Sequence, residues 1–478
     1  TSGGVRFSML AALRAFASEK LEQALERAAT EARHAGYYVS LGKKLAADVD
    51  ANNDARVEDR LALEVENLTA VIERARNQAR PSTGVVTMAL EAALALDAIV
   101  AQRASASEQL ALLDRALSLA DGKGVAARVL LRGHVARGEA RRLVGSFDQA
   151  RVDLNTALDL AAKESDAAGE TRAHLGLGSI ALSTQKLGAA EDSLARALSL
   201  AENARDDVSA GRALSQLGKV SRLRRRLDES EARCRRAVEL LTRARDQRGA
   251  GRARVELAST LLSARKLDDA ARVAHDAIDA LGALGGLGDR RSLVHAWGTL
   301  AVIEVDRKRF DDAESAATRA VDAAVKVADR KAEGLYLGMR ASALHARGAL
   351  IDARETYAHA SRTLFDVGDD AYGAFFTAAL GAVHAALDDV DGASRSFALA
   401  ERRVSTAERP LLAFAVTTFA TLLVLARAGD AETQRRARDA IKARVDEARA
   451  RGGAFEQSEE VRFAVRIAQT ALGSELTG

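Results

Sequence analysis

The feature that most constrains the fold is a repeat of forty residues in the middle of the chain. Similar two-residue segments recur at Phe147-Asp148, Leu187-Gly188, Leu227-Asp228, Leu267-Asp268, Phe310-Asp311, Leu350-Ile351 and Val390-Asp391. Successive segments are 40, 40, 40, 43, 40 and 40 residues apart, and the longer spacing coincides with the glycine-rich stretch 281–291. A constant period of this length predicts a stack of similar units, each contacting its neighbours, because a single unit is too small to bury its own apolar faces.

Each unit also carries small residues at constant positions. Nine residues before the two-residue segment stand Gly138, Gly178, Gly218, Ala258, Ala301, Ala341 and Gly381, and ten residues after it every unit has an alanine, from Ala157 to Ala400. The chain is rich in alanine, leucine and arginine, with two prolines and 4% aromatic residues, a composition that favours helix. Because small residues let two helices approach closely, we expect each unit to be a helical hairpin.

The order of these small residues resembles the tetratricopeptide repeat, although the usual unit has about 34 residues and its terminal proline is missing here. The resemblance covers residues 125–404 and implies an all-α fold: an α-solenoid, a right-handed superhelix of seven helical hairpins. We expect an N-terminal helical cap at residues 1–80, a degenerate first repeat at 81–124, and a degenerate last repeat with a capping helix at 405–478.

Residues 1–80 do not follow the repeat. The pieces "RFSMLAALRAFA", "HAGYY" and "LEVENLTAVIERA" occur there in an order similar to the junction between a winged-helix module and tetratricopeptide repeats in bacterial STAND-class signal-transduction ATPases and transcriptional regulators. The residues that carry this resemblance are Arg6, Phe7, Leu10, Arg14, Ala17, His34, Tyr37, Glu64, Asn67 and Leu68, whereas Ala11, Ala12 and Phe16 depart from it. An unrelated helical cap is the alternative.

The STAND resemblance implies that a nucleotide-binding part precedes this chain, which would then be a fragment of a longer protein. No G-x-x-x-x-G-K-[ST] phosphate-binding loop occurs in the chain itself. The first residue is not methionine, and the N-terminal sequence lacks the features of a signal peptide.

Charge and cysteine content limit the remaining classes of protein. The 70 basic and 67 acidic residues give a net charge of +3, whereas a typical nucleic-acid-binding domain has a larger basic excess. The single cysteine, Cys234, excludes an internal disulfide and fits a reducing compartment. The most apolar stretch, 411–427, is predicted to be a buried helix rather than a membrane span. We therefore expect a cytoplasmic protein without membrane attachment.

No catalytic or metal-binding motif is present, so we expect neither enzymatic activity nor a cofactor. The eight histidines form no H-E-x-x-H motif. His134 and His174 share one repeat position, which we interpret as packing between repeats, and Cys234 stands where other repeats have large apolar residues, which predicts burial. The acidic pairs Asp268-Asp269 and Asp311-Asp312 are expected to cap the second helices.

One set of positions is a candidate partner-binding groove. The tetratricopeptide resemblance implies that residues early in the first helix, and those seven residues later, face the concave side. The predicted basic and polar part comprises Arg132, Arg172, Arg212, Arg252 and His295 with Glu139, Ser179, Lys219 and Ser259, and the apolar part contains Leu335, Met339, Phe375 and Ala382. Arginines there would bind carboxylates or phosphates. The alternative is that they only pair with acids of neighbouring repeats.

Two functions follow. The first is a non-enzymatic sensor or protein-interaction scaffold that binds a protein or peptide, including an acidic one, or a small effector. The alternative is a helical repeat that binds nucleic acid through the arginine-rich region 212–254. Acidic residues interrupt that region and aromatic residues for base stacking are nearly absent, which disfavours the alternative. Self-association is plausible for a solenoid, and the sequence does not decide it.

Overall fold

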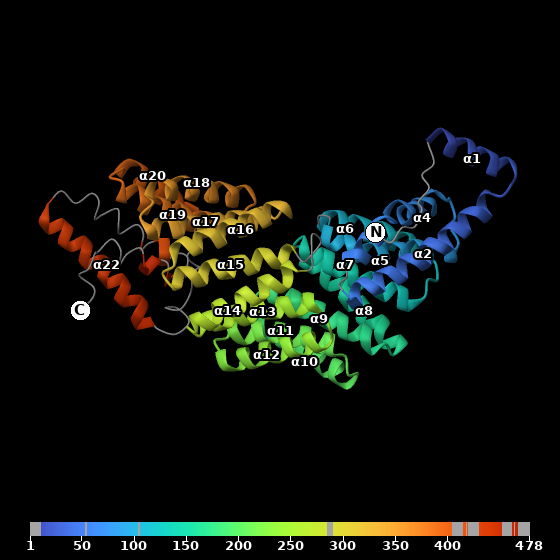
Figure 1. Ribbon diagram of the computed structural model, residues 1–478, viewed down its shortest axis with the longest axis horizontal. Coiled ribbons are helices and arrows are strands. Elements are labelled where there is room, and N and C mark those ends of the chain that lie inside the picture. The colour runs from blue at the N-terminus through green and yellow to red at the C-terminus, as the bar shows by residue number, and fades with distance from the viewer. Residues whose placement is uncertain are drawn as a thin grey trace. The chain divides into compact units, whose positions relative to one another are not determined.

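The computed structural model describes residues 11–52, 55–103, 106–283, 290–403, 414–416, 418, 430–451, 461–462 and 464–466. Every regular element among these residues is an α-helix, which confirms the all-α fold. The chain divides into two compact units, residues 1–186 and 187–478, and Figure 1 labels their helices.

The first unit begins with four helices that precede the repeats and continues as helical hairpins. Its helices are α1 (Ala11–Gln23), α2 (Arg27–Asn52), α3 (Ala55–Ala62), α4 (Val65–Asn77), α5 (Thr83–Arg103), α6 (Ala106–Ala120), α7 (Ala127–Leu143), α8 (Phe147–Glu164) and α9 (Ala167–Ser183). Each of α5 to α8 packs against the next helix in the chain.

The second unit consists mainly of hairpins of almost constant helix length. Its helices are α10 (Leu187–Asn203), α11 (Asp207–Leu223), α12 (Leu227–Arg243), α13 (Gln247–Ser263), α14 (Leu267–Gly282), α15 (Arg290–Asp306), α16 (Phe310–Lys326), α17 (Arg330–Arg347), α18 (Leu350–Asp366), α19 (Asp370–Ala386), α20 (Val390–Arg403) and α22 (Ala431–Arg451). Every two-residue segment of the repeat coincides with the start of a second helix, from Phe147 in α8 to Val390 in α20. The hairpin prediction is therefore confirmed.

The small residues lie where the two helices of a hairpin meet. A Cβ atom at Gly218 of α11 would lie 2.4 Å from the sulfur of Cys234 in α12. Opposite it, Ser230 and Ala237 of α12 are fully buried, and the Ser230 hydroxyl donates a hydrogen bond to the Gly218 carbonyl over 2.8 Å. The helices approach this closely because Gly218 has no side chain and leaves room for that of Cys234.

The connections between helices share one backbone geometry at intervals of twenty residues. Left-handed residues, with positive φ, occur at Gly145, Ser165, Gln185, Arg205, Arg225, Arg245, Arg265, Lys308, Ala328, Gly348, Gly368 and Asp388. At Arg225 the amide donates to the Arg222 carbonyl over 2.9 Å, and the next amide, of Arg226, donates to the Ser221 carbonyl over 2.8 Å. This pair of bonds is the Schellman motif, which satisfies carbonyls at the helix end.

We expect Ala328→Gly to raise the free energy of unfolding by about 0.5–1 kcal/mol. The left-handed conformation (φ 53° at Ala328) costs an L-residue about 1–2 kcal/mol, and the greater freedom of glycine in the unfolded chain offsets about 0.4–1 kcal/mol of that gain. Thermal melts would measure the difference. Gly348→Ala, at φ 85°, is the reverse control and should lower the melting temperature; a lower melting temperature for Ala328→Gly would contradict the prediction.

Aspartates mainly cap first helices, although Asp389 caps the second helix α20, where it accepts a hydrogen bond from the Gly392 amide over 2.8 Å. Asp246, for example, accepts a hydrogen bond from the Gly249 amide over 2.8 Å at the start of α13, and the same role falls to Asp166, Asp206, Asp329 and Asp369. The prediction that the Asp268-Asp269 pair caps α14 is wrong, because the N-cap is Lys266 and makes no side-chain cap. These aspartates instead pair with Arg307 and Arg272, over 2.7 and 2.8 Å.

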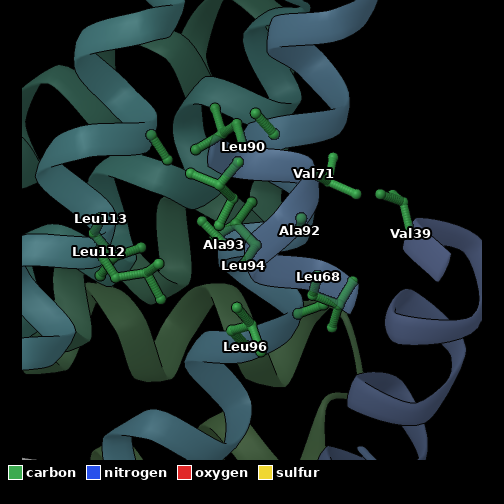
Figure 2. Packing of buried hydrophobic residues seen from close by; sticks show 14 of the residues in the cluster. Val39, Leu68, Val71, Leu90, Ala92, Ala93, Leu94, Leu96, Leu112 and Leu113 are labelled. Atoms are coloured by element: carbon green, nitrogen blue, oxygen red, sulfur yellow. The ribbon is translucent and has the colours of Figure 1, made fainter. Parts of the chain in front are cut away.

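The N-terminal helices of the first unit pack on the hairpin of α5 and α6. Figure 2 shows Leu68 and Val71 of α4 beside the apolar residues of α5, with Leu112 and Leu113 of α6 completing the cluster. Leu68 is fully buried, whereas Tyr37 is 63% exposed.

Parts of the predicted N-terminal and C-terminal regions lie outside the described residues. Arg6, Phe7 and Leu10 of the STAND-like junction are among them, as are 404–413, 419–429, 452–460 and 467–478. In the described part of the C-terminal region, Arg462 and Arg466 form ion pairs of 3.4 and 2.9 Å with Asp306 at the end of α15. Ala464 belongs to the buried cluster around α17 to α20.

Candidate interaction surface

In the second unit, the candidate groove residues lie on first helices that pack side by side. Arg212 is on α11, Arg252 on α13 and His295 on α15, and α13 contacts both α11 and α15. All three residues are exposed. The fold therefore brings them to neighbouring positions on one set of helices, as the repeat spacing predicted.

Each of these residues also contacts the next first helix. An Nη atom of Arg212 lies 2.9 Å from Asp246, the cap of α13; Arg252 Nε donates to Ser292 Oγ over 3.1 Å; and His295 Nδ1 lies 3.2 Å from Tyr336 Oη. The predicted alternative of pairing between repeats is thus present. Because the Arg212 side chain remains 53% exposed, its other N–H groups stay available to solvent.

The electrostatics of the Arg212 contact are set by Asp246, whose side chain is 5% exposed. Burial alone would raise the pKa of Asp246, but the positive charge of Arg212 and the hydrogen bond from the Gly249 amide outweigh it and lower the pKa. The carboxylate therefore stays ionised, and it fixes one edge of the Arg212 guanidinium.

The candidate positions seven residues further along the first helices are less exposed. Lys219 of α11 lies 3.8 Å from Glu256 of α13, which also pairs with Arg222 over 3.4 Å. Burial would raise the pKa of Glu256, and the charges of Lys219 and Arg222 lower it below its usual value. Ser259 Oγ donates to the Val255 carbonyl of its own helix over 3.0 Å.

The first unit carries the remaining basic and polar candidates. Arg132 of α7 is half-buried and Arg172 of α9 is exposed. Glu139 pairs with Arg142 one turn along the same helix, and Ser179 Oγ donates to the Leu175 carbonyl over 2.9 Å.

The apolar part of the predicted groove needs correction. Phe375 is 3% exposed and packs against Phe376 with ring centroids 5.1 Å apart, so it is a core residue and does not line an open surface. Ala382 is 4% exposed, while Met339 and Leu335 are partly buried against the same cluster. These side chains share that cluster with Ala415, Val416 and Ala464 of the C-terminal region. The repeat positions do not predict contacts with these residues.

At least seven of the thirteen arginines of region 212–254 form ion pairs with acids. Arg224 and Arg226 both pair with Glu191 of α10, and Arg243 lies 2.8 Å from Asp207. The further pairs are Arg212 with Asp246, Arg222 with Glu256, Arg233 with Glu229, and Arg235 with Glu231. In the connection between α11 and α12, Glu191 thus balances Arg224 and Arg226, whereas burial and the charges of Arg462 and Arg222 lower the pKa of Arg225.

A buried polar cluster in the first hairpin was not predicted. Asp153 of α8, 1% exposed, lies 2.9 Å from His134 Nδ1, 2.7 Å from Arg137 and 2.9 Å from Arg141, all on α7. Both arginines also reach Asp114 of α6, each over 3.2 Å. His134 thus binds within its own hairpin, which corrects its interpretation as packing between repeats.

Chemistry of the cluster follows from its charges. Burial alone would raise the pKa of Asp153, but hydrogen bonds from His134 and Arg137 and the charges of both arginines outweigh it and lower the pKa. His174 occupies the same repeat position and lies 3.8 Å from Glu170 of its own helix.

Reactive and metal-binding groups are not assembled in the described part of the chain. Burial raises the pKa of Cys234 to about 12, so the thiol stays protonated and unreactive. Among the described residues, no group of three or more histidine, cysteine or acidic side chains is placed to hold a metal ion. None of the helices described there is both long enough and apolar enough to cross a membrane.

Comparison with known proteins identifies the fold. No protein-family model matches the chain, and no curated protein matches it. Among solved structures, a signal-transduction ATPase with numerous domains (STAND) that has a tetratricopeptide repeat sensor, from Pyrococcus horikoshii, is similar with a TM-score of 0.58 and 14% identity over 77% of this chain and 54% of that one. The apo form of RapI gives 0.50 and 10% over 80% and 97%. A Rap protein complexed with Competence and Sporulation Factor gives 0.49 and 12% over 80% and 98%. At 14% and 10% identity, the likeness to the STAND protein and to RapI shows the fold alone, a solenoid of tetratricopeptide-like hairpins.

Proposed function

We propose that this chain is a non-enzymatic sensor or interaction scaffold that binds an acidic protein or peptide through the first helices of the second unit. The observation that carries the proposal is the exposed column of Arg212, Arg252 and His295 on α11, α13 and α15. One guanidinium edge of Arg212 is held by Asp246, which orients the other edge toward solvent and lowers the entropic cost of binding a carboxylate.

The comparisons support a sensor role within a larger protein. The STAND protein, whose printed description includes a tetratricopeptide repeat sensor, shares this fold, and the chain spans about half of its length. We infer that this chain is likewise the sensor part of a bacterial, cytoplasmic STAND-class regulator, with the ATPase part contributed by sequence outside it. Arg132 and Arg172 of the first unit are likewise proposed to bind an acidic partner.

The test is binding of short synthetic peptides, graded from acidic to basic, measured by fluorescence polarisation on the full chain. We expect acidic peptides to bind best and the variant Arg212→Gln/Arg252→Gln to weaken that binding by at least about tenfold, because hydrogen bonds to charged groups contribute about 1.5–3 kcal/mol each. Glutamine removes the positive charge but keeps a polar side chain, and thermal melts check that the packing between repeats is preserved.

Arg272→Gln is the matched control. Arg272 is also exposed, at 61% of its side chain, but it lies on the second helix α14 and pairs with Asp269. The proposal fails if the control weakens acidic peptides as much as the double variant does, or if acidic and basic peptides bind alike.

The nucleic-acid alternative has its own test. Retention of DNA or RNA on filters at low salt, falling steeply as salt rises, would favour it. The pairing of the arginines in region 212–254 with acids supports the scaffold instead.

A further inference from the structure

A cavity of about 350 Å³ lies between α14, α15 and α16 of the second unit. Its walls include Ile278, Trp297, Leu300, Glu304, Ala316 and Arg319. None of these residues belongs to the candidate interaction surface, so the cavity raises a separate question about what it holds.

Glu304 is the most unusual residue of this wall, because it is an acid that is only 3% exposed. Its Oε1 atom accepts a hydrogen bond from Arg307 over 2.9 Å. Its Oε2 atom is buried and has no hydrogen-bond partner in the described part of the chain. A buried carboxylate oxygen without a hydrogen-bond donor is costly. The cavity wall therefore carries an acceptor that could bind a donor from outside the chain.

The first hairpin shows how this fold satisfies a carboxylate at the same place. Counted from the start of the second helix, Trp297, Leu300, Glu304 and Ala316 occupy the positions that His134, Arg137, Arg141 and Asp153 occupy in the first hairpin. There, two guanidinium groups and an imidazole surround the buried Asp153 carboxylate. The fifth hairpin has the carboxylate on the facing helix, at the position of Arg141, whereas the apolar Leu300 replaces Arg137 and the small Ala316 replaces Asp153.

The third and fourth hairpins fill these positions in other ways. In the third, Arg233 stands at the position of Ala316 and donates to Ser221 Oγ, the counterpart of Glu304, over 2.7 Å. In the fourth, Leu261 and Val273 occupy the two positions and belong to a buried apolar cluster. The fifth hairpin therefore combines a buried acid with a small residue that leaves room for a group from outside the chain.

We propose that the cavity between α14, α15 and α16 binds a small molecule that carries a guanidinium group. The guanidinium would donate to the free side of the Glu304 carboxylate, in the place that Arg233 takes in the third hairpin, and the apolar part of the molecule would pack on Trp297, Leu300 and Ile278. The tryptophan already accepts such a group, since the Arg319 guanidinium lies 4.7 Å from its ring centroid.

The other charges around the cavity are nearly balanced. Asp279 and Asp312 add negative charge, and Arg309 and Arg319 add positive charge. Because Arg307 neutralises one side of Glu304, the binding energy of a cationic ligand comes from the directed hydrogen bonds of a guanidinium and not from a strong net field. That geometry discriminates a guanidinium from a neutral group of the same shape.

The experiment uses Trp297, the only tryptophan of the chain, as an intrinsic fluorescence probe in the full-length chain. The probes are N-acetyl-L-arginine methylamide and its citrulline counterpart, which replaces the guanidinium by an uncharged urea of nearly the same shape. We expect a saturable fluorescence change with the arginine compound and binding at least about tenfold weaker with the citrulline compound.

Two variants test the assignment of the residues. Glu304→Gln keeps the size of the side chain and should weaken the arginine compound by about tenfold or more. Ala316→Arg should abolish binding, because its guanidinium fills the cavity as Arg233 fills the third hairpin. Asp311→Asn, which removes an acid that is adjacent in sequence to Asp312 but does not line the cavity, is the control and should bind like the unchanged chain.

Equal responses to the arginine and citrulline compounds would overturn the proposal, as would unchanged binding by Glu304→Gln and Ala316→Arg with normal thermal melts. Peptide binding through Arg212 and Arg252 is tested with other residues and another readout. Each proposal can therefore fail without affecting the test of the other.

Discussion

Asp153→Ala is expected to lower the free energy of unfolding by about 3–5 kcal/mol, the cost of removing one partner from a buried ion pair. The substitution leaves the guanidinium groups of Arg137 and Arg141, both 17% exposed, without their common carboxylate. Asp114 stays in contact with both arginines, but at 43% exposure its carboxylate is well solvated. Denaturant unfolding followed by circular dichroism would measure the loss.

Asp114→Ala is the matched control for Asp153→Ala, because it removes an exposed acid from the same arginines, and we expect a loss of about 1 kcal/mol or less. Equal losses for the two variants would contradict the assignment of Asp153 as the centre of the cluster.

Acid titration provides an independent measurement on the same residue. Since the pKa of Asp153 is lower in the folded chain than in the unfolded chain, its stabilising contribution is complete above the unfolded pKa and is lost as the pH falls toward the folded one. The unchanged chain should therefore lose more stability on acidification than Asp153→Ala does.

Phe376→Ala is expected to cost about 3–5 kcal/mol, as substitutions of buried phenylalanine by alanine do. Phe376 of α19 is 1% exposed; its ring stacks on Tyr357 of α18 with centroids 6.1 Å apart. A Cβ atom at Gly338 of α17 would lie 2.1 Å from the same ring. Three helices thus meet at this side chain, and its removal leaves a cavity that none of them can close without moving the others.

Thermal and denaturant unfolding of Phe376→Ala should be compared with Val367→Ala, which shortens a side chain that is 41% exposed and should change stability by no more than about 0.5 kcal/mol. A loss below about 1 kcal/mol for Phe376→Ala would show that this junction of helices adjusts freely.

The repeat period predicted the hairpins well because it reports a physical requirement of each unit. A second helix begins at Phe147, Leu227 and Leu350 alike, since a small residue must stand where the helices cross and a turn must follow at a constant distance. The period also predicted that Arg212, Arg252 and His295 would share one set of neighbouring helices. The repeat period reports backbone geometry, so the sequence was sufficient to predict the backbone of the hairpins.

The repeat period did not predict contacts between side chains. Phe375 occupies the same position as Arg212, yet it is buried with residues of the C-terminal region, which lie far away in the sequence. The cluster around Asp153 and the cavity beside Glu304 each depend on substitutions in a single repeat. A comparison of the repeats at the positions of Arg141 and Asp153 would have revealed both, because the fourth repeat has the apolar Leu261 and Val273 there and the fifth has Glu304 opposite the small Ala316.

The left-handed connections have a consequence for how such an array can be tuned. Residues such as Ser165, Gln185, Arg205 and Ala328 hold a conformation that suits glycine better. They lie at intervals of about one helix, so we expect the effects of changing them to add. Each connection is therefore a separate position at which the stability of one hairpin can be raised or lowered, while the residues that face a partner stay unchanged.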